Sequence, residues 1–154
     1  MTETAEQRLA KLGVTLPVPA APAANYVPYR RSGNLLYTSG QVPMKDGKLA
    51  GAGLLGRDLD VAAGQEAARI CAINVLAIAK AATGDLETIR QAVKVTVFVA
   101  SAPDFSQQHL VANGASDFIV AVLGERGRHA RSAIGMASLP LNAAVEVEAI
   151  FEIA

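Results

Sequence analysis

The chain has 154 residues, its 14 lysines and arginines are balanced by 14 aspartates and glutamates, and it contains a single cysteine. This length supports one domain with one sizeable core, and the balanced charge gives no overall field that would attract nucleic acid. One cysteine excludes an intrachain disulfide, so a reducing cytoplasm is the expected compartment. We identify no segment that approaches the roughly 20 apolar residues needed to cross a bilayer, and we expect no membrane association.

Charged residues are scarce in this sequence. They make up 18% of the chain, against about 25% in an average protein. So little charge would leave much of a monomer's surface apolar. We therefore predict a homo-oligomer that buries apolar surface between its subunits.

The N-terminal part is expected to be an extension of the main domain. Thr4 can cap a short helix that ends at Gly13, and a connector rich in proline and alanine follows over residues 17–22. We assign residues 1–24 to this helix and connector, and residues 25–154 to the folded domain.

The middle of the chain alternates strands and helices. The pattern predicts a strand over 35–39, a polar turn over 45–48, a helix over about 61–82, a strand over 93–99 and a helix over about 104–123. Crossovers between such elements place both helices on one face of a sheet. The other face is left uncovered, and we expect another subunit to meet it.

Two strands end the chain, and the first of them carries an arginine beside small residues. With a strand's period of two, Arg131 shares a face with Ala133, Gly135 and Ala137. Such small side chains leave room beside a guanidinium, whose planar fork suits a carboxylate or phosphate. Alternatively, a helix or subunit fills that room, and Arg131 only pairs with a surface acid.

The last strand places two glutamates on one face. Its apolar residues from Val145 to Ile153 alternate with Glu146 and Glu148. Periodicity alone favours a solvated face. If the face meets other subunits, at least one glutamate must be hydrogen-bonded or lie at a cleft, where it could orient or deprotonate a water.

Three motifs suggest other chemistry but lack its context. Gly51–Gly56 has the dinucleotide-binding spacing, yet it follows a turn and not a buried strand, so we expect a loop that could border a pocket. Cys71 lies on the helix stripe and is expected to be a small buried residue. Ser39 lacks the Gly-x-Ser-x-Gly elbow of a nucleophile and is better suited to hydrogen-bonding a ligand.

The histidines and the one basic cluster are also expected to be structural. His109 and His129 have no acidic or cysteine partner at metal-ligand spacing, so we predict no metal site. Arg126 and Arg128 belong to a basic run without the aromatic residues that single-stranded RNA binding favours, and we expect a solvated loop there.

Five sequence blocks, in order, resemble the signature blocks of the RidA (YjgF) family, some members of which are described as L-PSP endoribonucleases. The blocks are Tyr26-Val-Pro, Tyr37-Thr-Ser-Gly-Gln-Val-Pro43, Val93 to Val99 with Asp104-Phe105, Ala130-Arg-Ser132, and Leu139 to Ala149. The resemblance extends from about Tyr26 to the C-terminus. It implies a chorismate-mutase-like α+β domain, with a mixed sheet and two long helices on one face, assembled as a homotrimer with clefts between subunits.

The resemblance also implies an activity, which is hydrolysis of reactive enamines and imines of the 2-aminoacrylate type to 2-keto acids and ammonia. Arg131 would hold the substrate carboxylate, and Glu146 would help to position the attacking water. The backbone of Ala133 would contact the substrate nitrogen, and the cleft would be lined by Tyr26, Ser39 and Gly40. Since an imine is already electrophilic, no metal or organic cofactor is implied.

Two departures indicate a divergent subgroup. Many family members have cysteine where this chain has Ala133, and an acidic residue near Gly135. Two alternatives stay open: RNA cleavage that depends on Arg126, Arg128 and His129, and a non-catalytic trimer that binds small carboxylates or keto acids. The balanced charge and the absence of stacking aromatics weigh against the nuclease.

Overall fold

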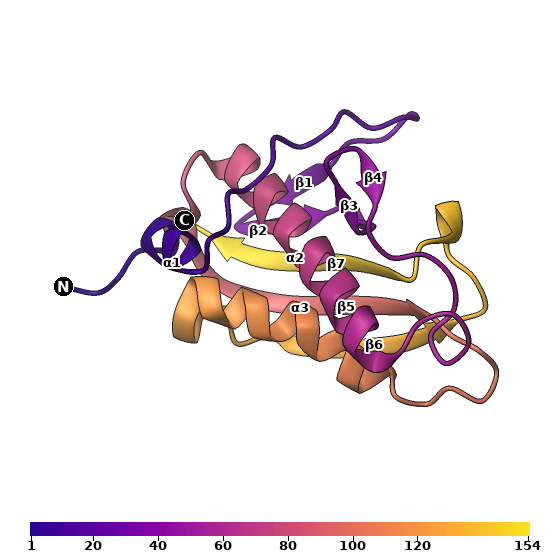
Figure 1. The fold of residues 1–154 in the computed structure, drawn as a ribbon. Coiled ribbons are helices and arrows are strands. Elements are labelled where there is room, and N and C mark those ends of the chain that lie inside the picture. The colour runs from indigo at the N-terminus through magenta and orange to yellow at the C-terminus, as the bar shows by residue number, and fades with distance from the viewer.

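A computed structural model describes residues 1–154 and contains a five-stranded sheet with its long helices on one face (Figure 1). The strand order is β1 (Tyr29–Ser32), β2 (Leu35–Thr38), β7 (Val145–Ile153), β5 (Ile89–Ala100) and β6 (Ala130–Met136). β6 is parallel to β5, and all other neighbours are antiparallel. A separate two-stranded ribbon joins β3 (Met44–Lys45) to β4 (Lys48–Leu49). This mixed α+β sheet is the fold class predicted from the sequence.

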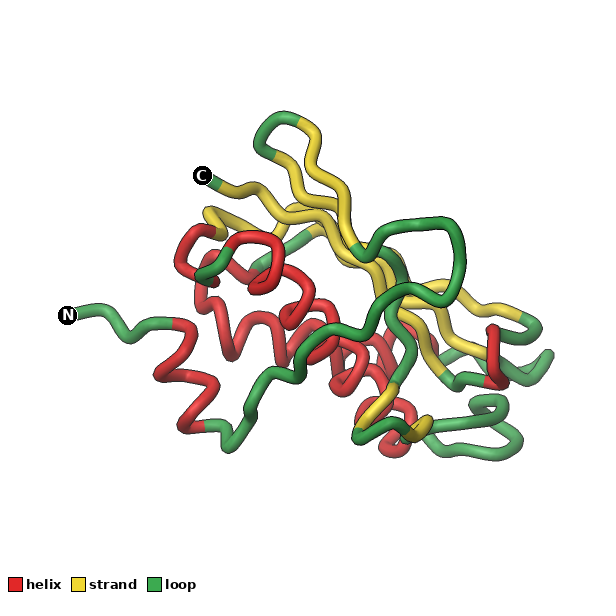
Figure 2. The backbone as a smooth tube through the Cα atoms, turned by 90° about the horizontal axis from the view of Figure 1, so that it is seen from above, coloured by secondary structure: helices red, strands yellow, loops and turns green.

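The helical layer consists of α2 (Val61–Thr83) and α3 (Gln108–Leu123), with the short α1 (Ala5–Lys11) beside them (Figure 2). Single 3-10 turns, η1 (Leu86–Thr88), η2 (Gly124–Gly127) and η3 (Pro140–Asn142), precede β5, β6 and β7. The α2 helix begins at the N-cap Asp60, whose side chain accepts from the backbone of Ala63, and ends at Gly84 with φ of 80°.

The predicted start of α3 was four residues too early. The helix begins at Gln108, and its N-cap Gln107 makes no side-chain hydrogen bond. Asp104 instead lies in a turn that the backbone N–H of Phe105 closes by donating to the carbonyl of Ala102, at 3.0 Å. Asp104 is a residue type that favours both helix N-caps and turns, so the sequence pattern alone does not distinguish the two.

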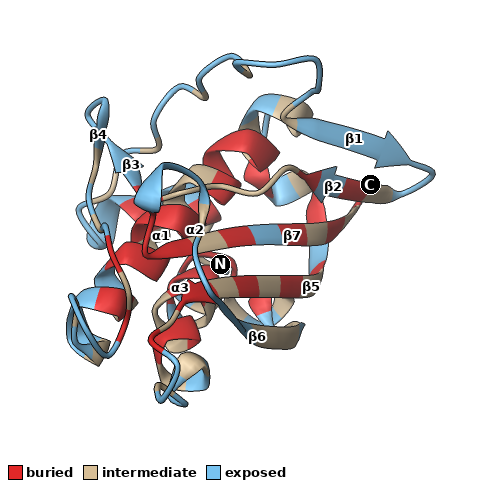
Figure 3. Cartoon of the chain, turned by 90° about the vertical axis from the view of Figure 1, so that its right-hand side faces the viewer, coloured by how far each residue is buried: buried red, intermediate tan, exposed pale blue.

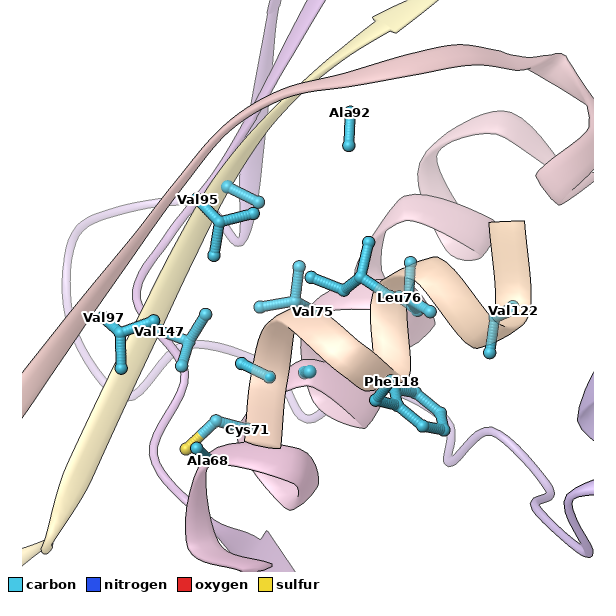
Figure 4. Close-up of a cluster of buried hydrophobic side chains, with 14 of the residues drawn as sticks. Ala68, Cys71, Val75, Leu76, Ala92, Val95, Val97, Phe118, Val122 and Val147 are labelled. Atoms are coloured by element: carbon cyan, nitrogen blue, oxygen red, sulfur yellow. The ribbon is translucent and has the colours of Figure 1, made fainter. Parts of the chain in front are cut away.

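The core fills the space between the sheet and the helices. Figure 4 shows side chains from α2, α3, β5 and β7 meeting there, and Val95, Val97 and Val147 are fully buried. Burying an aliphatic side chain of this size contributes about 1.5–3 kcal/mol, so the alternating valines fix which face of β5 meets the helices. Cys71 lies in the same core as a small buried residue, as predicted.

The N-terminal helix packs onto this core. Thr4 and Gln7 form a capping box at the start of α1, and the backbone N–H of Ala5 donates to Glu87 at 2.8 Å. Ala5 and Leu9 are buried in the main hydrophobic cluster. The connector that follows crosses the helical layer before it reaches β1 (Figure 2).

The expectation that no segment approaches membrane-spanning length was too strict. The α2 helix has 23 residues and is long and apolar enough to cross a membrane by length and composition alone. More than half of its most apolar window is buried against the rest of the chain. Its apolar character is that of a core helix, which passes the same test.

The second face of the sheet is uncovered in the chain. Tyr37, Ile134 and Met136 are exposed on it, and the Nζ of Lys94 on β5 donates to the hydroxyl of Ser132 on β6 across it, at 2.9 Å. Figure 3 shows the matching alternation of buried and more exposed residues along β5 and β7. Both long helices therefore lie on one face, as the order of elements predicts.

Candidate functional site

Arg131 lies near the start of the edge strand β6 and points to the helical side. Its register partner on β5 is the buried Val95, which defines that face. Nη1 donates to Oδ1 of Asn113 at 2.9 Å and to Oγ of Ser116 at 3.2 Å, and Nη2 donates to the carbonyl of His109 at 3.1 Å. These three partners lie along one side of α3, so the helix holds the guanidinium in a fixed orientation.

All the partners of Arg131 are neutral. No carboxylate lies within salt-bridge distance of its guanidinium, whereas Arg126 and Arg128 both have acidic partners. Nε and one of the two Nη2 hydrogens make no hydrogen bond within the chain. Within the chain Arg131 therefore pairs with no acid, and a half-buried positive charge keeps two donors for a ligand.

The room beside the small residues of β6 is partly filled by α3. A Cβ added to Gly135 would lie 2.8 Å from Nε2 of Gln108, which also donates to Ser101 at 3.2 Å. The alternative in which a helix fills that room therefore holds at Gly135. An amide, and not an empty pocket, occupies the space beside that residue.

The backbone of Ala133 faces outward at the free edge of the sheet. The carbonyl of Met136 accepts from the N–H of Ser101, which follows β5, at 2.8 Å. Backbone groups in a parallel ladder alternate between the two sides of a strand, so those of Ala133 point away from β5. The N–H and carbonyl of Ala133 are available beside Arg131.

Glu146 lies at the start of β7 on the uncovered face and touches Gly40. A Cβ added to Gly40 would lie 2.9 Å from Cδ of Glu146, so a larger residue there would displace the carboxylate. The half-buried carboxylate has no hydrogen-bond or ion-pair partner in the chain. Desolvation raises its pKa above the ordinary glutamate value, and repulsion from Glu148 raises that pKa further.

Ser39 follows the end of β2 and precedes Gly40, and Tyr26 lies in the segment before β1. The hydroxyl of Ser39 donates to the carbonyl of Val27 at 2.6 Å, which ties the two segments together. Both residues line an open cavity of about 440 Å³ with Tyr37. Tyr26 is 58% exposed, so most of its ring is available to a ligand or to another subunit.

The six predicted site residues thus fall into two groups within one chain. We name Arg131 and Ala133, with α3 beside them, the arginine half-site, and we name Tyr26, Ser39, Gly40 and Glu146 the glutamate half-site. Two features separate the half-sites: they use opposite faces of the sheet, and β5 lies between β6 and β7. No single chain brings Arg131 and Glu146 together.

Sequence reasoning missed the residues that hold Arg131. Ser116 accepts from Arg131 and also lies 3.0 Å from Nε2 of His129, whose Nδ1 lies 2.6 Å from the carbonyl of Gly127. The signal that could have found them is the shared strand parity of His129 and Arg131, together with Asn113 and Ser116 at helical spacing on the preceding helix.

The basic cluster is mostly engaged in internal contacts. Arg126 donates to the carbonyl of Ile89 at 2.6 Å and pairs with Glu87 at 3.1 Å, so it anchors η2 to β5 and is not the solvated residue predicted. Arg128 is exposed and lies 3.6 Å from Glu125, as a surface residue would.

Comparisons with known proteins identify the family. The family model described as "YjgF/chorismate mutase-like, putative endoribonuclease" matches residues 6–153. Protein TCP17 of Trypanosoma cruzi is 52% identical over 146 residues, which are 94% of this chain and 91% of that protein.

Two solved structures extend the comparison. The structure of Atu1372 from Agrobacterium tumefaciens, a protein with unknown function, is 61% identical, with a TM-score of 0.92 over 97% of this chain and 92% of its own. The structure of E. coli TdcF with bound serine is 26% identical, with a TM-score of 0.63 over 89% of this chain and 94% of its own. The chain belongs to the YjgF/chorismate mutase-like family, which is the RidA (YjgF) family that its sequence blocks resemble.

Proposed function

We propose that this protein hydrolyses reactive imines and their enamine tautomers, of the 2-aminoacrylate type, to 2-keto acids and ammonia, in clefts between the subunits of a homotrimer. Water adds across the C=N bond to give a hemiaminal, and Glu146 accepts one proton of that water. Glu146 returns this proton to the nitrogen, which completes the hemiaminal with one hydroxyl and one amino group. The hydroxyl then loses its proton, the proton passes to the amino group, and the C–N bond breaks as the keto group forms and ammonia leaves.

The observation that carries this proposal is that Arg131 has only neutral partners. A half-buried guanidinium without a counter-ion favours an anion, and its free donors at Nε and Nη2 suit a carboxylate. Once the carboxylate is held, the imine nitrogen of a 2-imino acid lies within a few bonds of it. The outward backbone of Ala133 is a natural contact for that nitrogen.

Glu146 is suited to proton transfer because its environment disfavours the charged form. Desolvation and the nearby Glu148 raise its pKa toward the range in which a carboxyl both accepts and returns a proton. Gly40, which has no Cβ, leaves space for the carboxylate, and the oxygen atoms of Glu146 make no hydrogen bond within the chain. These oxygens therefore remain available to a water.

Two subunits are needed because the half-sites lie on opposite faces of the sheet. The uncovered face carries Tyr37, Ile134 and Met136, which another subunit would cover. In a cyclic trimer, the arginine half-site of one subunit would meet the glutamate half-site of the next. The solved structure of TdcF with bound serine supports a small amino acid-like ligand for this fold.

The direct test is turnover of 2-iminopropanoate generated in situ by an amino-acid oxidase. Semicarbazide competes with hydrolysis for the imine, so an active protein lowers semicarbazone formation and speeds ammonia release. We expect Arg131→Ala to abolish this effect. The matched control is Arg128→Ala, which removes an exposed arginine three residues away and should leave the rate unchanged. Equal rates for wild type and Arg131→Ala would remove Arg131 from the mechanism.

Mixed oligomers test whether the site is shared. Arg131→Ala and Glu146→Gln should each be inactive alone, but co-refolding them in equal amounts creates clefts with one intact half-site from each parent. If a cyclic trimer assembles at random, about one quarter of its clefts contain both Arg131 and Glu146. We therefore expect about one quarter of wild-type activity. No recovered activity in trimers that have demonstrably mixed would show that Arg131 of one subunit and Glu146 of another do not act in one cleft.

The same assay separates the alternatives. A protein that binds pyruvate without speeding ammonia release would be a carboxylate binder. Salt-sensitive cleavage of RNA would support the nuclease, although internal contacts already engage Arg126 and His129.

A further inference from the structure

We propose that Ser116 and His129 are positioning residues for Arg131, and that protonation of His129 increases the affinity of Arg131 for a carboxylate. The inference rests on the proposed role of Arg131 and extends it to Ser116 and His129, neither of which is among the six predicted site residues. It depends on a chain of hydrogen bonds from the carbonyl of Gly127 to the guanidinium.

The hydrogen bonds assign the protonation state of His129. Nδ1 lies 2.6 Å from the carbonyl of Gly127, which can only accept, so Nδ1 carries a hydrogen. In a neutral ring Nε2 then has a lone pair, and it accepts from the Ser116 hydroxyl at 3.0 Å. With its hydrogen directed to His129, the Ser116 oxygen presents a lone pair to Nη1 of Arg131, at 3.2 Å. His129 therefore orients the acceptor that orients Arg131.

The serine–histidine pair orients Arg131 and is not an activated nucleophile. A nucleophilic serine needs electron density on its oxygen, whereas a guanidinium donates to the oxygen of Ser116 and withdraws that density. Asn113 provides a second acceptor for the same Nη1, at 2.9 Å. Together the two side chains use both hydrogens of Nη1 and leave Nε free.

Arg131 is the charged group that acts on His129. Burial lowers the pKa of His129, and the positive charge of Arg131 lowers it further. The other charged or titratable groups on the packed elements are engaged or directed elsewhere: Lys94 bonds to Ser132 on the opposite face, Arg126 bonds to Ile89, Glu125 pairs with Arg128, and Asp117 and His109 are exposed.

The sign of the effect follows from linkage. A carboxylate that binds Arg131 neutralises the charge that disfavours protonation of His129, so binding makes His129 easier to protonate. Linkage is reciprocal, so protonated His129 must strengthen carboxylate binding by the same factor. When the ring is protonated, its Nε2 donates to Ser116, whose oxygen has two lone pairs and still accepts from Arg131. His129 and Arg131 are two hydrogen bonds apart and partly solvated, so we expect protonation of His129 to raise the affinity for a carboxylate about three- to tenfold.

The test is the affinity for pyruvate between pH 5 and 8, measured by calorimetry. Because Glu146 also gains a proton as the pH falls, all variants are made in a Glu146→Gln background. We expect affinity to rise about three- to tenfold toward pH 5 with His129 present, and to be flat in His129→Gln, whose amide accepts from Ser116 but does not titrate. Ser116→Ala should bind about tenfold more weakly at every pH. Ser116→Thr keeps the hydroxyl and should bind pyruvate with the same affinity as the Glu146→Gln parent.

A second measurement needs no ligand. The imidazole signal of His129 in NMR spectra follows its titration, and the signal lost in His129→Gln assigns it. We expect Arg131→Ala to raise the pKa of His129. An unchanged pKa, or the same pH dependence of affinity in His129→Gln, would overturn the inference, while pyruvate binding itself would still uphold the proposed role of Arg131 in holding a carboxylate. Absence of pyruvate binding at every pH would remove the proposed role of Arg131 and the inference with it.

Discussion

Gly40 and Glu146 are in direct contact although they are 106 positions apart in the sequence, and a Cβ on the glycine would meet the Glu146 side chain. The bridge between Gln41 and Val147 brings the end of β2 to the start of β7 and creates this contact. Gly40 does not have a left-handed backbone, and its lack of a Cβ instead leaves the space that the carboxylate of Glu146 occupies.

Gly40→Ala should therefore act on the chemical step. The added methyl group would displace the flexible end of Glu146, and a carboxylate moved by about 1 Å costs up to about 100-fold in kcat. Pyruvate affinity, which depends on Arg131, should stay within about twofold, and the melting temperature should change by a few degrees at most. Unchanged kcat for imine hydrolysis would show that the position of Glu146 does not limit the reaction.

The pH dependence of hydrolysis should report Glu146. The ionised carboxylate is the base, so activity is lost as the pH falls through the pKa of Glu146, which desolvation and repulsion from Glu148 hold above the ordinary glutamate value. Glu148→Gln removes the repulsion and should move the acidic limb of the kcat profile to lower pH.

Glu152→Gln is the matched control for this pH prediction. Glu152 shares the strand and face of Glu148 but hydrogen-bonds to Gln91, farther along β7. Its substitution should leave the acidic limb in place. A limb that moves equally in both variants would reflect overall charge and not the pair Glu146–Glu148.

Cys71 should be inert in the folded protein. Burial raises the pKa of its thiol well above the ordinary value, and the charge of Glu146 raises that pKa further. Because the thiolate is the reactive form, a disulfide reagent such as DTNB at pH 8 should label almost no native protein and about one thiol per chain in urea. Rapid labelling of native protein would mean that the core around α2 opens.

The elements predicted well from the sequence are those marked by a signal among neighbouring residues, such as a regular alternation of buried and exposed positions. The two-residue alternation of β7 predicted its helix-covered face, and Gly84 predicted the end of α2, because each signal lies within a few neighbouring residues. By contrast, all four residues of β1 are exposed, so no apolar alternation marks that strand. Only the turn residues Gly33 and Asn34 could have indicated the hairpin.

The candidate site was only partly predictable, for a different physical reason. Small residues beside Arg131 indicated a special environment, but its partners Asn113 and Ser116 are 18 and 15 positions away and depend on how α3 packs across β6. The separation of Arg131 from Glu146 also depends on strand order. Parity along a strand gives a face, but it does not say which strand lies between two others.

The packing of α2 on α3 gives a last prediction, based on two helical glycines. A Cβ on Gly114 of α3 would lie 2.7 Å from the backbone carbonyl carbon of Gln65 on α2, which cannot move without shifting the helix. A Cβ on Gly64 would lie 2.7 Å from Cδ1 of Leu55, a side-chain atom that can rotate away. Alanine gains about 1 kcal/mol of helix propensity over glycine at both positions, so the difference between the variants isolates the clash.

We expect Gly114→Ala to lower the free energy of unfolding by about 1–3 kcal/mol, and Gly64→Ala to lower it less. Urea unfolding at one protein concentration measures both, and equal stabilities would show that the two helices separate without cost.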